Sequence, residues 1–220
     1  MTLPNAAKGV KKMFIAEILQ LIAAVLLLIS AISLGAGVVS AFDGNEGAAT
    51  GAFATGGIFG TLGIILPLIA LILSLVGMWQ ASKDEPDRMK KAFWFAIATL
   101  VLGVLQGFVF TDFWSLFDEA NWNWAGFLST LESLAEMCMM IFAIMGVSEV
   151  TQNIAREDVA DMGPKVITIS VVAIAIAIIA PIFGTIIGGI ASIISLVCMV
   201  AAYIVYLVFL GKASSALSKA

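Results

Sequence analysis

Two glutamates stand in an otherwise apolar stretch, at a spacing that would suit cation binding. Glu132 and Glu136 lie in TLESLAEMCMMIFAIM, residues 130–145, and with Ser129 and Ser133 they follow the i, i+3, i+4, i+7 pattern of one helix face. Two neighbouring carboxyl groups can share one proton or bind a cation together. These four residues therefore predict a polar binding site for a proton, a cation or a small polar molecule.

The helix expected over 125–147 would carry Glu136 near its middle, close to the midplane of a bilayer. A charge at the centre of a spanning helix costs about 2.5–3.5 kcal/mol, whereas each Leu, Ile, Phe or Val contributes only about 0.3–0.6 kcal/mol. The helix alone is then roughly neutral for insertion. We expect other helices to hold it, with the polar face turned inward as a wedge that opens toward the exterior.

Neither glutamate has an obvious internal counter-charge. The chain contains no histidine, and no predicted membrane segment contains Lys or Arg. Three states remain open: both carboxyl groups are protonated, the pair shares one proton, or the pair binds a cation from outside. The first state could be purely structural, because a protonated glutamate can join helices through hydrogen bonds worth about 1 kcal/mol.

The composition predicts the elements that position this face. The chain has 220 residues, of which 61% are hydrophobic and 12% charged, and its mean hydropathy is +1.09. A spanning helix needs about 20 apolar residues. We therefore predict an all-α, polytopic transmembrane helical bundle whose six apolar runs lie at 13–41, 58–79, 92–110, 125–147, 166–183 and 187–210.

Charge predicts the orientation of these helices. All eleven basic residues lie before the first run or after the second, fourth and sixth, and the alternate connectors carry only acids: Asp43, Glu46, Asp112, Asp118 and Glu119. The positive-inside rule then places both termini in the cytoplasm of a multi-pass protein of the cell membrane. The uncharged stretch 166–210 is expected to turn at 181–189 (PIFGTIIGG), although a re-entrant pair that does not cross stays an alternative.

A weak internal repeat divides the single transmembrane domain, 1–220, into three hairpins at 1–80, 81–150 and 151–220. The first helix of each hairpin begins with basic residues followed by apolar ones, within residues 11–14, 90–93 and 164–167, the last of which starts with Pro164. Such starts are also common to unrelated membrane hairpins, so repetition and coincidence both remain open. Three glycine pairs at i, i+4 spacing predict close helix packing: Gly56 with Gly60, Gly103 with Gly107, and Gly184 with Gly188.

Two connectors each allow two interpretations. Aromatic residues at 113–124 beside acids indicate an interfacial belt, with an aromatic ligand platform as the alternative. In the connector 148–163, Val150, Ile154 and Val159 follow one helix face, and Gly163-Pro164 is expected to stop it. This connector is either a solvated linker or a helix that docks another protein. Cys138, Cys198 and the methionines of 137–145 are interpreted as packing residues.

The absences exclude several classes of protein. Without histidine there is no zincin motif and no Ser-His dyad, and no Gly-rich phosphate loop occurs. We expect no enzyme, no cofactor, no metal and no nucleic acid partner. Two hypotheses remain: a transporter or transporter subunit that handles a small cationic or polar ligand at Glu132 and Glu136, and an accessory membrane protein that docks a partner membrane protein.

Overall fold

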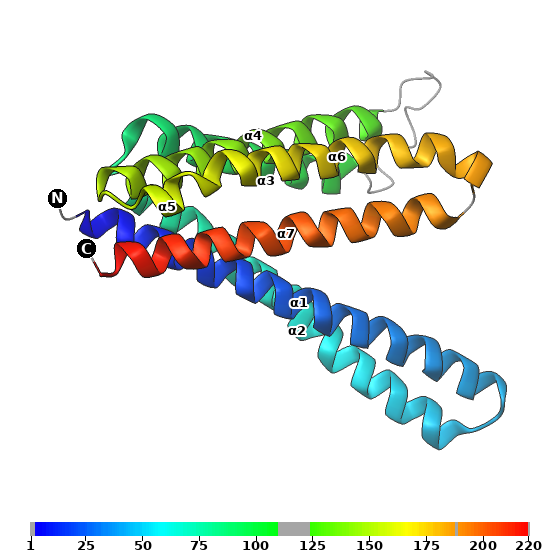
Figure 1. Ribbon diagram of the computed structural model, residues 1–220. Coiled ribbons are helices and arrows are strands. Elements are labelled where there is room, and N and C mark those ends of the chain that lie inside the picture. Colours follow the sequence, from blue (N-terminus) through cyan, green and yellow to red (C-terminus); the bar gives the residue numbers. More distant parts are fainter. Residues whose placement is uncertain (1–2, 110–123, 188, 220) are drawn as a thin grey trace. The chain divides into compact units, whose positions relative to one another are not determined.

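The computed structural model of the protein describes residues 3–109, 124–187 and 189–219 (Figure 1). Within these ranges every regular element is a helix. Each of six long helices contains a stretch long and apolar enough to cross a membrane, which confirms the all-α class and the number of helices. Together with one short helix they are α1 (Pro4–Phe42), α2 (Glu46–Ala81), α3 (Pro86–Val109), α4 (Trp124–Asn153), α5 (Glu157–Ala160), α6 (Met162–Ile187) and α7 (Gly189–Leu217).

The long helices extend past the apolar runs that predicted them. They contain between 24 and 39 residues, which corresponds to about 36 to 58 Å at 1.5 Å per residue. A hydrocarbon layer is only about 30 Å thick, so the helix ends reach into the polar interfaces. Hydropathy locates the apolar part of each helix, but intrahelical hydrogen bonds continue into the polar residues on either side.

Prolines also lie inside the helices. The break between α5 and α6 falls at Asp161, ahead of the predicted stop, because α6 begins at Met162 and includes Gly163 and Pro164. The predicted stop at Gly163-Pro164 is wrong, since proline costs little in a first turn, whose N–H groups lack intrahelical partners. Likewise α6 continues through Pro181 to Ile187, so the turn is narrower than 181–189.

The chain divides into two compact units, Lys12–Val76 and Met1–Lys11 with Gly77–Ala220. The first unit is a hairpin of α1 and α2 with a seam of small residues. A Cβ atom on Gly56 would lie 2.7 Å from Leu34 Cγ, and one on Gly60 would lie 2.9 Å from Ser30 Oγ. The buried Ser30 hydroxyl donates a hydrogen bond of 2.7 Å to the Gly56 carbonyl oxygen. The predicted Gly56 and Gly60 motif therefore packs two helices of the same chain.

In the second unit, α3 packs against α4 and α6 packs against α7. α4 also contacts α5, α6 and α7. The buried Met89 side chain of α3 lies against Gly146 of α4, where a Cβ atom would come within 3.0 Å of Met89 Cγ. α4 is thus the helix around which this unit assembles.

Polar contacts tie several segments together at one end of the second unit, where Figure 1 shows the beginning of α1, helix α5 and the end of α7. Asn5 Nδ2 donates to Asp84 Oδ1 at 2.9 Å, and the Ala6 amide donates to Asp84 Oδ2 at 2.8 Å. The buried Glu85 carboxylate accepts hydrogen bonds from the amides of Arg88 and Met89 and so caps the start of α3. The side of the membrane on which this end lies remains a prediction.

Candidate functional site

The four predicted site residues lie on one face of α4, which is a continuous helix through them. Glu132 is half-buried, whereas Ser129, Ser133 and Glu136 are exposed. The expectation of a face turned fully inward is therefore not met, because α3 packs beside this face and covers only Glu132 in part. The Ser133 hydroxyl donates a hydrogen bond of 2.9 Å to the Ser129 carbonyl oxygen, which commits its proton and leaves its oxygen lone pairs available.

The same face becomes buried further along α4. Ala143 lies seven residues beyond Glu136, about two helical turns away, and is only 2% exposed. Val147 and Val150, which follow on that side, are fully buried. The face is therefore open along its polar half and closed along its apolar half. A small ion at the glutamates would meet packed side chains if it moved along this face toward Ala143.

Gly103 of α3 makes room for one of the two carboxylates. A Cβ atom built on Gly103 would lie 2.9 Å from Glu132 Oε1, closer than a real Cβ contact. The glycine pair at 103 and 107 predicted a close approach of helices, and at Gly103 that approach is made by a carboxylate. Gly107 and Gly188 are among the residues whose surroundings lie outside the description, as is Gly184.

The electrostatics of the pair favour a positive ligand. Glu132 and Glu136 are one helical turn apart, where Cβ atoms are about 5–6 Å from each other and like charges repel. Among the described residues no hydrogen bond or ion pair engages either carboxylate. Nor do those residues contain a cluster of three or more His, Cys, Asp or Glu side chains that could hold a metal ion. A proton or a small cation between the carboxylates would remove the repulsion.

A contact between α3 and α4 indicates the depth of the glutamates. The Lys91 ammonium lies 5.6 Å from the centroid of the Phe142 ring, and lysine ammonium groups at helix ends reach for the interface. Glu136 is six residues from Phe142, or about 9 Å along the helix axis, and Glu132 is ten residues away, or about 15 Å. With Phe142 at the interface of a layer about 30 Å thick, Glu132 would lie nearer the midplane than Glu136, whereas the sequence predicted Glu136 there.

An aromatic group at the basic end supports this depth. The Trp79 and Phe93 rings are 5.3 Å apart and the Phe93 and Trp94 rings 5.7 Å, and both tryptophans are largely exposed. Exposed tryptophans beside Lys90 and Lys91 are typical of a membrane interface. Sequence reasoning placed the aromatic belt at 113–124, of which only Trp124, the first residue of α4, lies within the described residues. It overlooked the rings of Trp79, Phe93 and Trp94, although they flank the basic connector.

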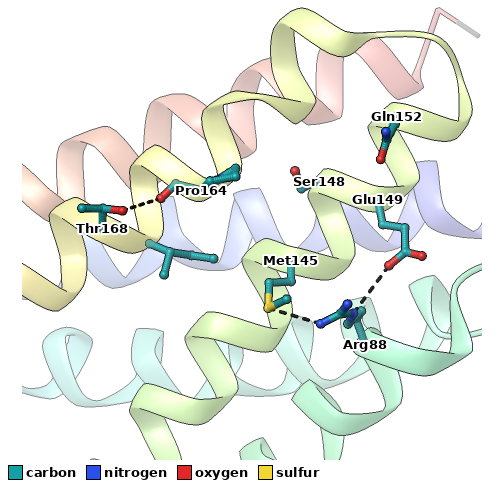
Figure 2. Close-up of a pocket in the computed structure, with 9 residues that line it drawn as sticks. Arg88, Met145, Ser148, Glu149, Gln152, Pro164 and Thr168 are labelled. Atoms are coloured by element: carbon teal, nitrogen blue, oxygen red, sulfur yellow. Dashed lines mark hydrogen bonds and ion pairs between the residues drawn. The ribbon is translucent and has the colours of Figure 1, made fainter.

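A pocket that sequence reasoning missed lies between α3, α4 and α6 (Figure 2). Its volume is about 600 Å³. Arg88 Nε lies 3.6 Å from Glu149 Oε2, and Arg88 Nη1 donates to Met145 Sδ at 3.5 Å. The remaining lining residues are Ser148, Gln152, Gly163, Pro164, Ile167 and Thr168. Only the packing of three helices brings these residues together, so no local sequence pattern marks the pocket.

The apolar side chains of the connector after α4 do not form an exposed face. Val150 and Val159 are buried and Ile154 is half-buried. The Ser148 hydroxyl donates to the Ala160 carbonyl oxygen and holds α5 against α4. The exposed residues of the connector include the charged side chains of Arg156, Glu157, Asp158 and Asp161.

The exposed charges of the connector include an ion pair. Arg156 Nε donates to Asp158 Oδ1 at 2.9 Å, and this hydrogen bond lowers the pKa of the Asp158 carboxyl below its ordinary value. The same bond raises the pKa of the Arg156 guanidinium. The pair stays ionised throughout the neutral range.

The two cysteines are half-buried free thiols.

Comparison with protein-family models, with curated proteins and with solved structures finds no match for the chain. Support for a function therefore comes from its own residues and their geometry.

Proposed function

We propose that this chain is a multi-pass protein of the cell membrane that binds a proton or small cation at Glu132 and Glu136 and moves it across the bilayer, alone or as a subunit of a larger transporter. The observation that carries the proposal is the Glu132 carboxylate against Gly103, deep along a spanning helix, with no cation beside it in the described part of the chain. An ionisable residue at such depth is a functional candidate by default.

The chemistry of the site follows from its charge. Two carboxylates one turn apart in a medium of low dielectric repel each other strongly, and each loses hydration. A bound cation or a shared proton relieves both penalties. The Ser133 oxygen, whose proton is committed to the Ser129 carbonyl, can act as a neutral ligand beside the carboxylates. Movement of the ion would then be coupled to the charge of the pair.

The proposal is tested with the purified chain in liposomes. Proton movement is followed with an entrapped pH dye and Na⁺ or K⁺ movement with the radioactive ions, under an imposed gradient. The parent protein should move at least one of these ions, and Glu136→Gln and Glu132→Gln should abolish that flux. Glu157→Gln, an exposed acid on α5, is the matched control and should match the parent. Equal flux in all four proteins would refute the proposal.

An accessory role has less support from the geometry. Docking through Val150 and Val159 would have to displace side chains that are buried within their own unit. In an accessory protein the α4 glutamates would only fasten helices, so Glu136→Gln would leave function intact. Replacement of 148–163 would release a stoichiometric partner co-purified from native membrane.

A further inference from the structure

The pocket between α3, α4 and α6 is separate from the glutamate pair. Glu149 lies 13 residues beyond Glu136 on α4, or about 20 Å along the helix axis. The pocket presents one positive and one negative side chain side by side, and both are partly open, with 37% of the Arg88 side chain and 46% of the Glu149 side chain exposed. Figure 2 shows these two side chains pointing toward one another.

The two charges have unused bonding capacity. A guanidinium carries five N–H donors, and in the described structure Arg88 spends one on a thioether sulfur, a weak acceptor. Its Nε contact with Glu149 spans 3.6 Å, which is too long for a good hydrogen bond. The backbone from which the Arg88 side chain extends is held, because the Glu85 carboxylate accepts hydrogen bonds from the Arg88 amide.

Opposite charges in one pocket select a ligand that carries both signs. A simple anion would meet the Glu149 carboxylate, and a simple cation would meet the Arg88 guanidinium. A zwitterion whose ammonium group donates to Glu149 and whose phosphate accepts from Arg88 satisfies both. Arginine is well suited to the phosphate, since its planar fork can give two parallel hydrogen bonds.

The place of the pocket in the fold favours a membrane-derived ligand. Arg88 is three residues from Lys91, which lies over Phe142, and the exposed Trp94 lies on the same helix. The pocket is thus at the level where headgroups meet the protein. Its wall also contains apolar groups, namely Met145, Pro164 and Ile167.

We propose that the pocket of Arg88 and Glu149 binds a phosphoethanolamine group, with the phosphate on Arg88 and the primary ammonium on Glu149. The group can come from the headgroup of phosphatidylethanolamine or from free phosphoethanolamine. This site is independent of ion binding at Glu132 and Glu136.

The test measures binding of three short-chain lipids with identical acyl chains to the full-length protein in detergent, by native mass spectrometry. Phosphatidylethanolamine should bind about tenfold more tightly than phosphatidylglycerol, which lacks the ammonium, and than phosphatidylcholine, whose quaternary ammonium has no N–H donor. Free phosphoethanolamine is added as a competitor. If free phosphoethanolamine displaces the lipid, the pocket recognises the headgroup alone. If it does not, the ligand is the intact phosphatidylethanolamine. Both results support the site when the selectivity holds.

Two variants separate a binding site from a simple clasp between α3 and α4. Arg88→Gln should weaken binding of phosphatidylethanolamine about tenfold, and Glu149→Gln should erase the preference over phosphatidylglycerol. Lys90→Gln and Glu157→Gln, which do not line the pocket, should bind as the parent does. The selectivity of the parent protein needs no variant, so a folding defect does not spoil the test. Equal binding of the three lipids, or an unchanged preference in Glu149→Gln, would overturn the proposal.

Discussion

The carboxylate of Glu132 lies over the bare backbone of Gly103, so that a Cβ atom at residue 103 would come within 2.9 Å of Oε1. Glutamate and glycine belong to different helices, α4 and α3, and the missing side chain at Gly103 leaves room for the carboxylate. The proposed ion site therefore depends on a residue that has no side chain.

Substitution at Gly103 should disturb the site more than the fold. In Gly103→Ala the new methyl group meets the flexible end of Glu132, which can turn away, while alanine raises helix propensity by about 1 kcal/mol. We expect a folded protein whose ion binding is weakened about tenfold. Gly35→Ala is the control, because a Cβ atom there meets nothing within 4 Å. Isothermal titration of both variants in detergent, with thermal unfolding alongside, checks this, and unchanged affinity in Gly103→Ala would speak against it.

The hairpin of α1 and α2 offers two adjacent glycines with opposite surroundings. In Gly56→Val the side chain collides with Leu34, and the Ser30 hydrogen bond to the Gly56 carbonyl is strained. We expect a loss of about 1–3 kcal/mol in the free energy of unfolding. Gly57→Val adds the same side chain where nothing lies within 4 Å. Its loss in the free energy of unfolding should be smaller than that of Gly56→Val by about 1 kcal/mol or more. Unfolding in sodium dodecyl sulfate compares them, and equal losses would argue against the seam.

Asp84 should hold the first residues of the chain. Its carboxylate accepts hydrogen bonds from Asn5 and from the Ala6 amide, and bonds to a charged group contribute about 1.5–3 kcal/mol each at most. Asp84→Ala should raise amide hydrogen exchange over residues 3–11 at least about tenfold. Asp161→Ala, an exposed acid outside this contact, should leave that exchange unchanged. Slow exchange at 3–11 in Asp84→Ala would show that other contacts hold this segment.

The Arg156 and Asp158 pair predicts a small acid dependence. Because the folded pKa of Asp158 is lowered from an ordinary value of 3.8, its contribution to stability is present above about pH 4 and is lost as the pH falls through the folded pKa. Both side chains are exposed, so salt should screen the effect. Carboxyl ¹³C titration should give an Asp158 midpoint below 3.8 that rises in Arg156→Gln. A midpoint that stays the same in both proteins would contradict the contact.

Hydropathy predicted the number of long apolar helices. Apolar runs longer than a bilayer crossing leave few alternatives to a spanning helix. The ends of the helices were harder to predict. Proline usually indicates that a helix stops, but Pro164 fits into the first turn of α6. Pro181 also led us to expect a turn over 181–189, but α6 continues through this proline to Ile187, so the turn is narrower.

The α4 face was predictable because its four residues share one helix, and helical spacing alone places them together. Sequence spacing could not predict the role of Gly103 or the pocket of Arg88 and Glu149. Arg88 and Glu149 are 61 positions apart in the sequence, and they meet only because α3 packs antiparallel on α4. Burial of Val150 and Val159 was missed for the same reason, since spacing shows an apolar face but not what covers it.

The central claim is that Glu132 and Glu136 bind a proton or small cation inside the membrane. Labelling with a hydrophobic carbodiimide tests it most directly, with the modified residues located by peptide mass spectrometry. The account predicts labelling at Glu132 or Glu136 that falls as the pH rises and falls again when the bound cation is added, and that is lost in a Glu132→Gln, Glu136→Gln double variant. Labelling confined to other acids, or labelling of these two that neither pH nor any added cation changes, would contradict it.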